Sequence, residues 1–475
     1  MKLFVVLRLQ KYNYPINTKI IIMRVHFIAI GGSAMHNLAL ALHHKGFNIT
    51  GSDDEIFEPS KTRLQKHNLL PAEMGWNADR INKDIDAVIL GMHARIDNPE
   101  LIRAKELDLK IYSYPEYIYE QTKDKIRVVI GGSHGKTSIT AIILHVLNYN
   151  NVDCDYMVGA QLSGFDTMVK LTHDAPIAIL EGDEYLSSPI DRRPKFHLYK
   201  PNIALISGIA WDHINVFPTY ENYVEQFEIF IDKIESQGSL IYCSEDKEVE
   251  KVALNSKNEI SKIPYSIPQY KISNGLTSLF DNESKEIPLL VFGEHNLMNI
   301  NGAKIVCNKL GLTDQQFYEA IKSFKGASKR LELVNKNDQT AIYKDFAHSP
   351  SKLKATTNAV KQQFPDRKLI ACMELHTFSS LNQTFLNEYN GSMENADEAF
   401  VYFNPHTIAH KKLEPITEQQ VLKAFNSSNI KVYTNSEKLI NDLKSKDWNK
   451  SNLLMMSSGN FDGVDFNAFA NEILK

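Results

Sequence analysis

The segment that most constrains how this chain folds is a short glycine-rich stretch, Gly131 to Ser138. An apolar run at 126–130 precedes it, and a second apolar run at 139–147 follows it. Strand, glycine loop and helix in this order are typical of a phosphate-binding loop, because glycines let backbone N–H groups approach phosphates closely. Lys136 can reach the terminal phosphates, and the hydroxyl of Thr137 can bind Mg²⁺. The sequence therefore predicts an α/β domain that binds ATP with Mg²⁺.

The loop departs from the strict phosphate-loop pattern at one position. That pattern requires a glycine five residues before Gly135, where this chain has Ile130. The alternative is an ordinary strand-to-helix turn that happens to carry a surface lysine. The run Gly135-Lys136-Thr137 at a strand exit favours a shortened phosphate loop over that alternative.

Length and composition limit the remaining possibilities. A chain of 475 residues is too long for one core and suggests about three domains. The net charge of -4 leaves no basic excess, so neither nucleic acid nor an anionic membrane is expected as a partner. The four scattered cysteines indicate buried thiols in a reducing, cytoplasmic setting. No stretch approaches transmembrane length, and we expect Met23 to be the natural start, with residues 1–22 an extension.

The amino-terminal part resembles a nucleotide-binding βαβ unit. The apolar run at 24–30 leads into Gly31-Gly32-Ser33, then a helix, a strand at 47–50 and Asp53. A diphosphate-type turn followed about 20 residues later by an acid is the arrangement of Rossmann folds. The third glycine of that fingerprint is missing, so a plain strand-to-helix turn remains open, and a nicotinamide oxidoreductase is a weak alternative. A further strand at 87–90 ends near His93.

Two later strands end in polar residues that suit a metal. The strand at 177–180 runs into Glu181, and the strand at 203–206 leads to Asp212-His213. Ligands of open parallel sheets bind at the carboxyl ends of strands, so both exits should flank the phosphate loop. Glu181 and His213 are candidate ligands for ATP-bound Mg²⁺. A solvated loop acid and a hydrogen-bonded loop histidine are the alternatives.

The rest of the chain completes a three-domain α/β fold. Residues 240–290 look like hairpins and loops, and a helix through 309 begins near His295. After Arg330, strands at 341–343, 369–372, 399–403, 430–433 and 453–456 alternate with helices near 351–363, 417–425, 436–444 and 465–474. We therefore expect a Rossmann-like nucleotide-binding domain at 24–125, a P-loop ATPase domain at 126–327 and a Rossmann-like carboxyl-terminal domain at 328–475.

This order of motifs resembles the Mur ligase family, which joins amino acids or peptides to the UDP-linked sugar acid of peptidoglycan. The resemblance covers residues 24–475. It implies metal binding by Thr137, Glu181 and His213, and catalytic roles for Lys136, Arg330 and His348. It implies UDP-sugar binding by Gly31, Gly32, Ser33 and Asp53, to which we add His93 at the next strand exit. The ATP-binding residues implied by position are Gly132, Ser133, His134, Gly135, Lys136, Thr137, Ser138, His295, Asn296, Asn299, Arg330 and Asp345.

Departures from the family pattern indicate which branch of the family the chain resembles. Gly208 stands where the family often has asparagine, and Lys344 where it often has an acid. Phe227 replaces the lysine that several members carbamylate, which favours the branch acting directly on the carboxylate of UDP-N-acetylmuramate.

Two amine substrates remain open within that branch, L-alanine and the tripeptide L-alanyl-γ-D-glutamyl-meso-diaminopimelate. The stretches 191–196 and 456–463 resemble the tripeptide enzyme, whereas His376 stands where that enzyme usually has arginine. The tripeptide is favoured.

The resemblance implies a two-step ligation through an acyl phosphate, with ADP and phosphate released. Lys136 lies in the second domain and Arg330 in the third, so chemistry should require domain closure. His348 is the candidate for steering or deprotonating the amine. A UDP-sugar sensor that binds ATP without turnover is the alternative from another class, suggested by Gly208 and Lys344. The protein is expected to be a monomer or homodimer.

Overall fold

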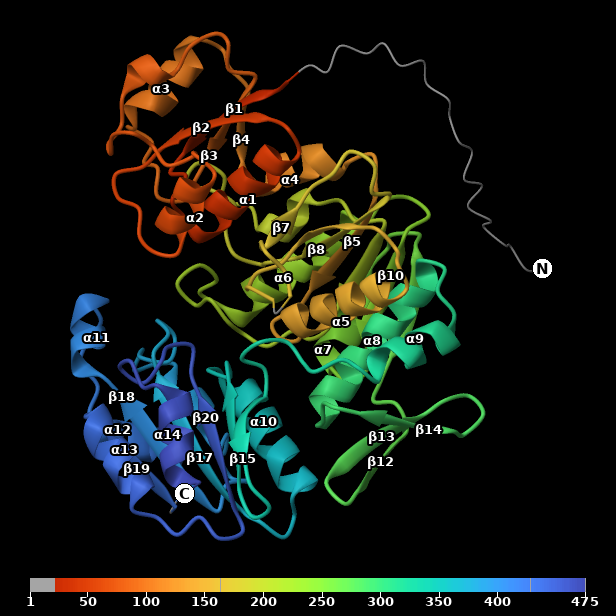
Figure 1. The fold of residues 1–475 in the computed structure, drawn as a ribbon, viewed down its shortest axis with the longest axis vertical. Helices are drawn as coiled ribbons and strands as arrows, with labels where there is room; N and C mark the ends of the chain where they lie inside the picture. Colours follow the sequence, from red (N-terminus) through yellow and green to blue (C-terminus); the bar gives the residue numbers. More distant parts are fainter. Residues whose placement is uncertain (1–21, 163, 428, 475) are drawn as a thin grey trace.

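The computed structural model describes residues 22–162, 164–427 and 429–474. Figure 1 shows three α/β units in sequence order, with the first sheet above the central one and the third beside its lower end. The predicted fold class is confirmed, since each unit is built on a largely parallel sheet. The expected extension at 1–22 lies, apart from Ile22, outside the described residues.

The first unit is a four-stranded parallel sheet in the order β2-β1-β3-β4. The first strand stops two residues earlier than predicted because Ala29 has a positive φ of 71°, and the N–H groups of Ala29 and Ile30 both donate to the carbonyl of Ser52. Its elements are β1 (Arg24–Ile28), α1 (Ser33–His44), β2 (Asn48–Ser52), α2 (Ser60–Lys66), the 3-10 helix η1 (Ala78–Arg80), β3 (Ala87–Leu90), α3 (Pro99–Glu106), β4 (Ile111–Ser113) and α4 (Tyr114–Thr122).

The central unit is a seven-stranded sheet in the order β11-β10-β9-β5-β8-β6-β7, parallel except for β7. Strand β5 lies between β9 and β8, so the phosphate loop that follows it emerges between the other two strand exits, as predicted. Its elements are β5 (Ile126–Gly131), α5 (Lys136–Tyr149), β6 (Asp155–Met157), β7 (Val169–Lys170), β8 (Ile177–Glu181), η2 (Lys195–Leu198), β9 (Ile203–Ile206), α6 (Tyr220–Asp232), β10 (Ser239–Cys243), α7 (Lys247–Asn255), β11 (Ser261–Tyr265), α8 (Glu294–Lys309) and α9 (Asp314–Ile321).

The prediction of hairpins and loops at 240–290 is wrong for its first half. Strands β10 and β11 belong to the central parallel sheet, and helix α7 connects them. The side chain of Asp246 caps this helix, and Val249, Val252 and Ala253 form its narrow buried face. Only the second half is antiparallel, with β12 (Tyr270–Ser273), β13 (Leu276–Phe280) and β14 (Glu286–Leu289) forming a small separate sheet.

The third unit is a six-stranded sheet in the order β15-β16-β20-β17-β18-β19. The alternation predicted from sequence is confirmed, but the antiparallel edge strand β15 was missed. Its elements are β15 (Glu332–Lys336), β16 (Ala341–Asp345), α10 (Pro350–Gln363), β17 (Lys368–Leu375), η3 (Leu386–Tyr389), β18 (Glu398–Phe403), α11 (Pro405–His410), α12 (Glu418–Phe425), β19 (Ile430–Tyr433), α13 (Ser436–Lys444), β20 (Ser451–Met456) and α14 (Phe466–Ile473).

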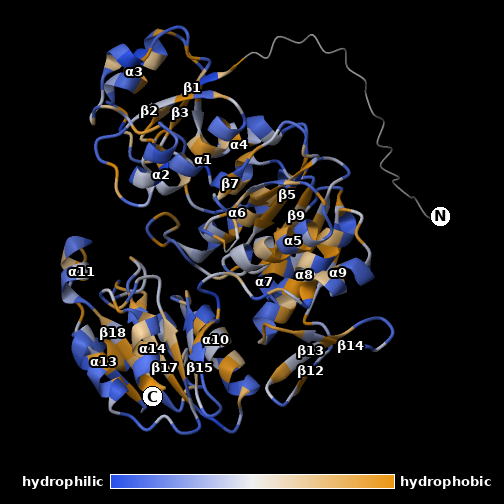
Figure 2. Cartoon of the chain, in the orientation of Figure 1, coloured by the Kyte–Doolittle hydropathy of each residue, from blue (hydrophilic) through white to orange (hydrophobic). Residues whose placement is uncertain are grey.

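The buried cores join the units. One apolar cluster runs from the first sheet into the central unit and includes Phe27 and Phe227. Phe292 of the central unit packs against the core of the third unit, where it contacts Tyr343 edge-on at 5.5 Å between ring centroids. Figure 2 shows apolar residues gathered on β5, α5 and α8 in the interior of the central unit. Such contacts place the strand ends of different units close to one another.

Candidate active site

A cavity of about 530 Å³ lies between the central and third units. It is lined by residues 133–138 of the phosphate loop, by strand exits of the central sheet and by the start of helix α10. Most of the residues implied to bind ATP or metal line it, namely Ser133, His134, Gly135, Lys136, Thr137, Ser138, Glu181, His213, His295, Asn296, Asn299, Arg330, Asp345 and His348. The structure therefore brings together segments more than 300 residues apart, from Ser133 to Ser458.

The phosphate loop requires glycine at two points. Gly132 and Gly135 have φ angles of 128° and 79°, a region that other residues rarely adopt. A Cβ on Gly135 would also lie 2.6 Å from Oδ1 of Asn299, so helix α8 packs directly against the loop. The loop then opens helix α5, whose N-terminal N–H groups and dipole favour an anion.

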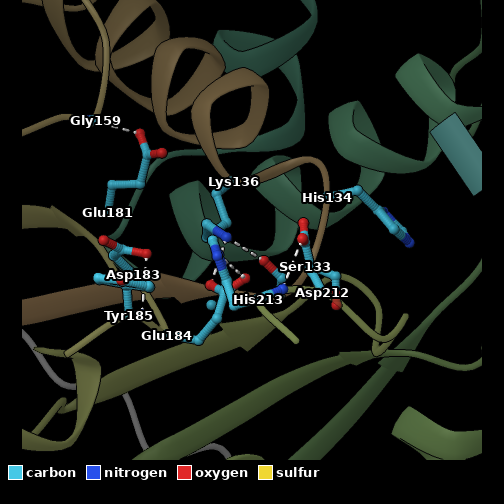
Figure 3. Close-up of polar contacts among 12 residues, drawn as sticks. Ser133, His134, Lys136, Gly159, Glu181, Asp183, Glu184, Tyr185, Asp212 and His213 are labelled. Atoms are coloured by element: carbon cyan, nitrogen blue, oxygen red, sulfur yellow. Dashed lines mark hydrogen bonds and ion pairs between the residues drawn. The ribbon is translucent and has the colours of Figure 1, made fainter. Parts of the chain in front are cut away.

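Lys136 forms a close ion pair that the sequence did not reveal. Its Nζ lies 2.6 Å from Oε2 of Glu184, whose side chain is fully buried, and also donates to the carbonyl of Gly132 at 2.6 Å (Figure 3). Tyr223 donates its hydroxyl to the other oxygen of Glu184 at 3.0 Å. Burial lowers the pKa of Lys136, but the carboxylates of Glu184, Asp183 and Glu181 more than compensate, so its pKa lies above the usual value.

Thr137 and Glu181 bring two oxygens together beside this pair. The Thr137 hydroxyl donates to Oε1 of Glu181 at 2.9 Å, and the N–H of Gly159 donates to Oε2 at 2.9 Å. His213 lies nearby, with its Nε2 3.8 Å from Oε1 of Glu184 and its ring edge-on to Tyr185 at 5.2 Å. Within the described residues, no group of three or more His, Cys, Asp and Glu side chains is arranged to hold a metal ion by itself.

The glycine at position 208 leaves room for the ring of His134, the histidine of the phosphate loop. The ring of His134 lies so close to Gly208 that any Cβ there would collide with it. Burial lowers the pKa of His134 to about 4, and burial likewise lowers the pKa of His295 to about 4. Both rings are therefore neutral at neutral pH, and they form an uncharged wall of the cavity.

The third unit contributes a cation and a buried acid from the opposite side. The guanidinium of Arg330 lies over the ring of Phe346, 4.7 Å from its centroid. Asp345 accepts N–H donors from Leu331 at 2.5 Å and Ala347 at 2.6 Å, and burial raises its pKa. The departure at Lys344 has a structural partner, since its Nζ lies 3.0 Å from Oε1 of Glu332 on β15.

His348 is held in one tautomer. Its Nδ1 lies 2.8 Å from the carbonyl oxygen of Phe346, which can only accept, so Nδ1 carries the proton and Nε2 is left as an acceptor. Burial lowers the pKa of His348 to about 3. Tyr389 fixes the backbone here by donating its hydroxyl to the His348 carbonyl at 2.5 Å. The ring is thus a neutral acceptor facing the cavity.

The exits of β17 and β20 form a polar edge next to the cavity. Glu374 is buried and accepts from the N–H of Phe461 at 2.9 Å and from the hydroxyl of Ser457. Its other oxygen lies 3.5 Å from Nδ1 of His376, which is more exposed. The hydroxyl of Ser458, which lines the cavity, is buried without a hydrogen-bond partner among the described residues. This edge therefore presents one unsatisfied buried hydroxyl, that of Ser458, at the cavity.

The predicted UDP-sugar residues lie away from this cavity, in the first unit. The N–H of Gly31 donates to Oδ2 of Asp53 at 2.7 Å, so the acid closes the turn before helix α1, which begins at Ser33. Burial raises the pKa of Asp53 to about 6. Gly32 precedes the helix as its cap, and His93 is exposed just after β3. These groups share one end of the first sheet.

Fold and site together define a three-domain α/β protein with a glycine-rich phosphate-type loop at the boundary between two domains. Three family models match the chain in order, the Mur ligase family catalytic domain at 24–125, the Mur ligase middle domain at 130–307 and the Mur ligase glutamate ligase domain at 329–459. The chain belongs to the Mur ligase family, whose members are ATP-dependent amide ligases of peptidoglycan synthesis.

Curated relatives belong to the same family, and solved structures share its fold. The chain is 31% identical over 370 residues to a UDP-N-acetylmuramate–L-alanine ligase of a Sulfurihydrogenibium species, covering 77% of this chain and 79% of that one. It is 32% identical to the enzyme of the same name from Caldicellulosiruptor bescii, covering 79% and 82%. Among solved structures, the UDP-N-acetylmuramate–alanine ligase of Thermotoga maritima has a TM-score of 0.65 at 19% identity, covering 93% and 96%. A murein peptide ligase of Psychrobacter arcticus has a TM-score of 0.61 at 21% identity, covering 95% and 98%.

Glu184 and Lys352 are among the cavity-lining residues that were not predicted from sequence. Glu184 belongs to the same acidic run as Glu181. The run indicated that an acid lies here, but it did not show which acid pairs with Lys136. Lys352 on α10 has no sequence signal of this kind. No helix among the described residues is both long and apolar enough to span a bilayer.

Proposed function

We propose that this protein joins the lactyl carboxylate of UDP-N-acetylmuramate to the α-amine of L-alanyl-γ-D-glutamyl-meso-diaminopimelate, using ATP. A carboxylate oxygen bonds to the γ-phosphorus while the bond between that phosphorus and the leaving ADP oxygen breaks, which gives an acyl phosphate. The amine nitrogen then bonds to the acyl carbon, phosphate leaves, and the nitrogen loses a proton. The observation that carries this proposal is the cavity that collects Lys136, Glu181, His213 and Arg330 from two domains.

Charge neutralisation is the main task of the site. Two like charges about 4 Å apart repel by about 4 kcal/mol at an effective dielectric constant of about 20, so a carboxylate approaches a triphosphate only against strong repulsion. Lys136 approaches from the phosphate loop and Arg330 from the third domain. We infer that both cations surround the transferring phosphoryl group when the domains close, which also excludes water from the acyl phosphate.

The residues fit a bound Mg²⁺ that shares its ligands with ATP. Mg²⁺ requires six oxygen-rich ligands and usually combines one or two protein oxygens with water and phosphate. The paired oxygens of Thr137 and Glu181 match that requirement. His213, whose Nε2 lies 3.8 Å from Glu184, is the further candidate ligand. Bound there, the metal would neutralise negative charge on the phosphates.

His348 is proposed to orient the amine rather than to deprotonate it. Its Nε2 is a neutral acceptor facing the cavity, which suits a hydrogen bond from an attacking amine. A group with a pKa of about 3 is a weak base at neutral pH.

The choice of UDP-N-acetylmuramate rests on position 227 and on the first domain. Phe227 is fully buried between the rings of Phe196 and Tyr223, at 5.5 Å and 5.3 Å, so this site has no place for a metal-bridging lysine. We assign the diphosphate to the turn at Gly31, Gly32 and Ser33, and the rest of the nucleotide to Asp53 and His93. The proposed boundaries of the three domains are 24–125, 126–327 and 328–475.

Support for the tripeptide comes from the stretch at 191–196. It is integrated into the central domain rather than a loose insertion, because Lys195 pairs with Asp183 at 2.5 Å and Phe196 stacks on Phe230 at 4.5 Å. Arg193 extends from it to Glu116 of the first domain at 3.1 Å. L-alanine is the second candidate, favoured by the names of the curated relatives.

The test is ADP release by the purified protein with ATP, Mg²⁺ and UDP-N-acetylmuramate, plus either the tripeptide or L-alanine. We expect a kcat/KM at least about 10-fold higher for the tripeptide, a difference of about 1.4 kcal/mol in transition-state binding. Lys136→Met is the control, because ADP release that this protein catalyses should disappear in that variant. A preference for L-alanine would select the second candidate.

A further inference from the structure

Lys352 is a charged residue of the cavity to which the family resemblance assigns no role. It lies in the first turn of α10, whose first residue is Pro350, and it lines the cavity together with the phosphate loop. Its Nζ is 4.0 Å from Oδ2 of Asp212, a separation at the outer limit of an ion pair. Both side chains are largely buried, with 23% and 18% of their surface exposed.

Helix α10 of the third domain is attached to the central domain at its far end. At its far end, Gln363 donates to the carbonyl of Gly275 at 2.6 Å and accepts from the hydroxyl of Thr277 at 2.8 Å. Phe364, just beyond the helix, packs edge-on against Phe292. With its far end attached, the helix has its first turn at the cavity that the phosphate loop also lines.

Three cations converge on this cavity. Lys136, Arg330 and Lys352 all line it. Burial lowers the pKa of Lys352, Asp212 acts in the opposite direction, and the charges of Lys136 and Arg330 lower it further. Lys136 has a tight partner in Glu184 at 2.6 Å, whereas the partner of Lys352 is more distant. An anion carrying several charges in a small volume is the ligand that such a convergence fits.

We propose that Lys352 binds the γ-phosphate of ATP, and then the same phosphoryl group in the acyl phosphate, from the side of the third domain. This proposal rests on the ATP-dependent ligation proposed above. Lys136 reaches the phosphates from the central domain, so the two lysines hold the transferred group between them. A lysine suits this task because its ammonium is a compact charge on a flexible stem, which can follow a group that moves between two oxygens. Without nucleotide, Asp212 keeps the ammonium at the site.

The proposal predicts a nucleotide preference that can be measured without turnover. Lys352→Met should weaken binding of a non-hydrolysable ATP analogue by about 10-fold, as expected for losing one charged contact, and ADP binding by less than about 2-fold. Lys352→Arg should keep most of the preference for the analogue. The measurement is isothermal titration of each variant with Mg²⁺ and either nucleotide, alongside its thermal unfolding midpoint.

Lys354 provides the matched control on the same helix. Its side chain is 61% exposed and pairs with Glu394 at 3.0 Å on the surface, so Lys354→Met should leave both affinities unchanged. The proposal is overturned if Lys352→Met leaves analogue binding unchanged, or weakens ADP and the analogue equally. Wild-type protein that binds neither nucleotide would instead refute the proposed ATP-dependent function.

Discussion

The buried pair of Lys136 and Glu184 allows the effect of one substitution on stability to be worked out from the structure. At 2.6 Å and an effective dielectric constant of about 20, their attraction is about 6 kcal/mol before desolvation is counted. Removing the lysine leaves a fully buried carboxylate without its cation, which typically costs about 3–5 kcal/mol. The Tyr223 hydroxyl still donates to that carboxylate, so we take the lower end of this range. A loss of about 3 kcal/mol in a domain of this size corresponds to an unfolding midpoint about 6–12 °C lower.

The assay compares Lys136→Met with the double variant Lys136→Met/Glu184→Gln. The single variant should lose both stability and ligand-stimulated ADP release. The neutral amide of the double variant needs no cation and keeps Tyr223 as a donor, so the unfolding midpoint should recover by at least half. Activity should stay lost, because no lysine reaches the phosphates. A Lys136→Met protein that unfolds at the wild-type temperature would refute the reasoning, as would a double variant no more stable than the single one.

Four further outcomes follow from other parts of the site. Gly208→Ala should weaken ATP-analogue binding by about 10-fold, because the new Cβ collides with His134, and adding His134→Ala should restore part of the loss in the same titration. The free energy of unfolding should fall as pH falls from about 6.5 to about 4, because burial lowers the pKa values of His134 and His295 to about 4 and the unfolded chain therefore binds protons on these histidines first. Denaturant titrations at several pH values measure this dependence, and His295→Gln should make the free energy of unfolding depend less on pH. Arg330→Ala should lower kcat by about 10³-fold in steady-state kinetics while leaving ADP affinity nearly unchanged, and an unaffected kcat would contradict its proposed role. His376→Ala should raise KM for the amine substrate without changing affinity for the ATP analogue, so a change in both would indicate a structural role.

Local sequence patterns predicted the elements that position the site. The apolar runs around Gly135 and the order of strands and helices after Arg330 predicted units that the structure contains. Helix α7 escaped prediction because its buried face consists of only three small apolar residues within a polar stretch. Edge strand β15 escaped because its sequence, Glu332 to Lys336, is mostly polar and gains its pairing only from β16.

The sequence by itself determined that a glycine-rich loop of the phosphate-binding type stands between two other α/β units, because glycine conformations and apolar periodicity are requirements of the local backbone. The tertiary structure alone decided which charges meet. Glu184 pairs with Lys136 across 48 residues, and Lys352 faces Asp212 across 140 residues from a different domain. Such pairings depend on sheet order and on how domains pack, and burial then sets how strongly the charges act on one another. No local pattern in a single chain records these long-range distances.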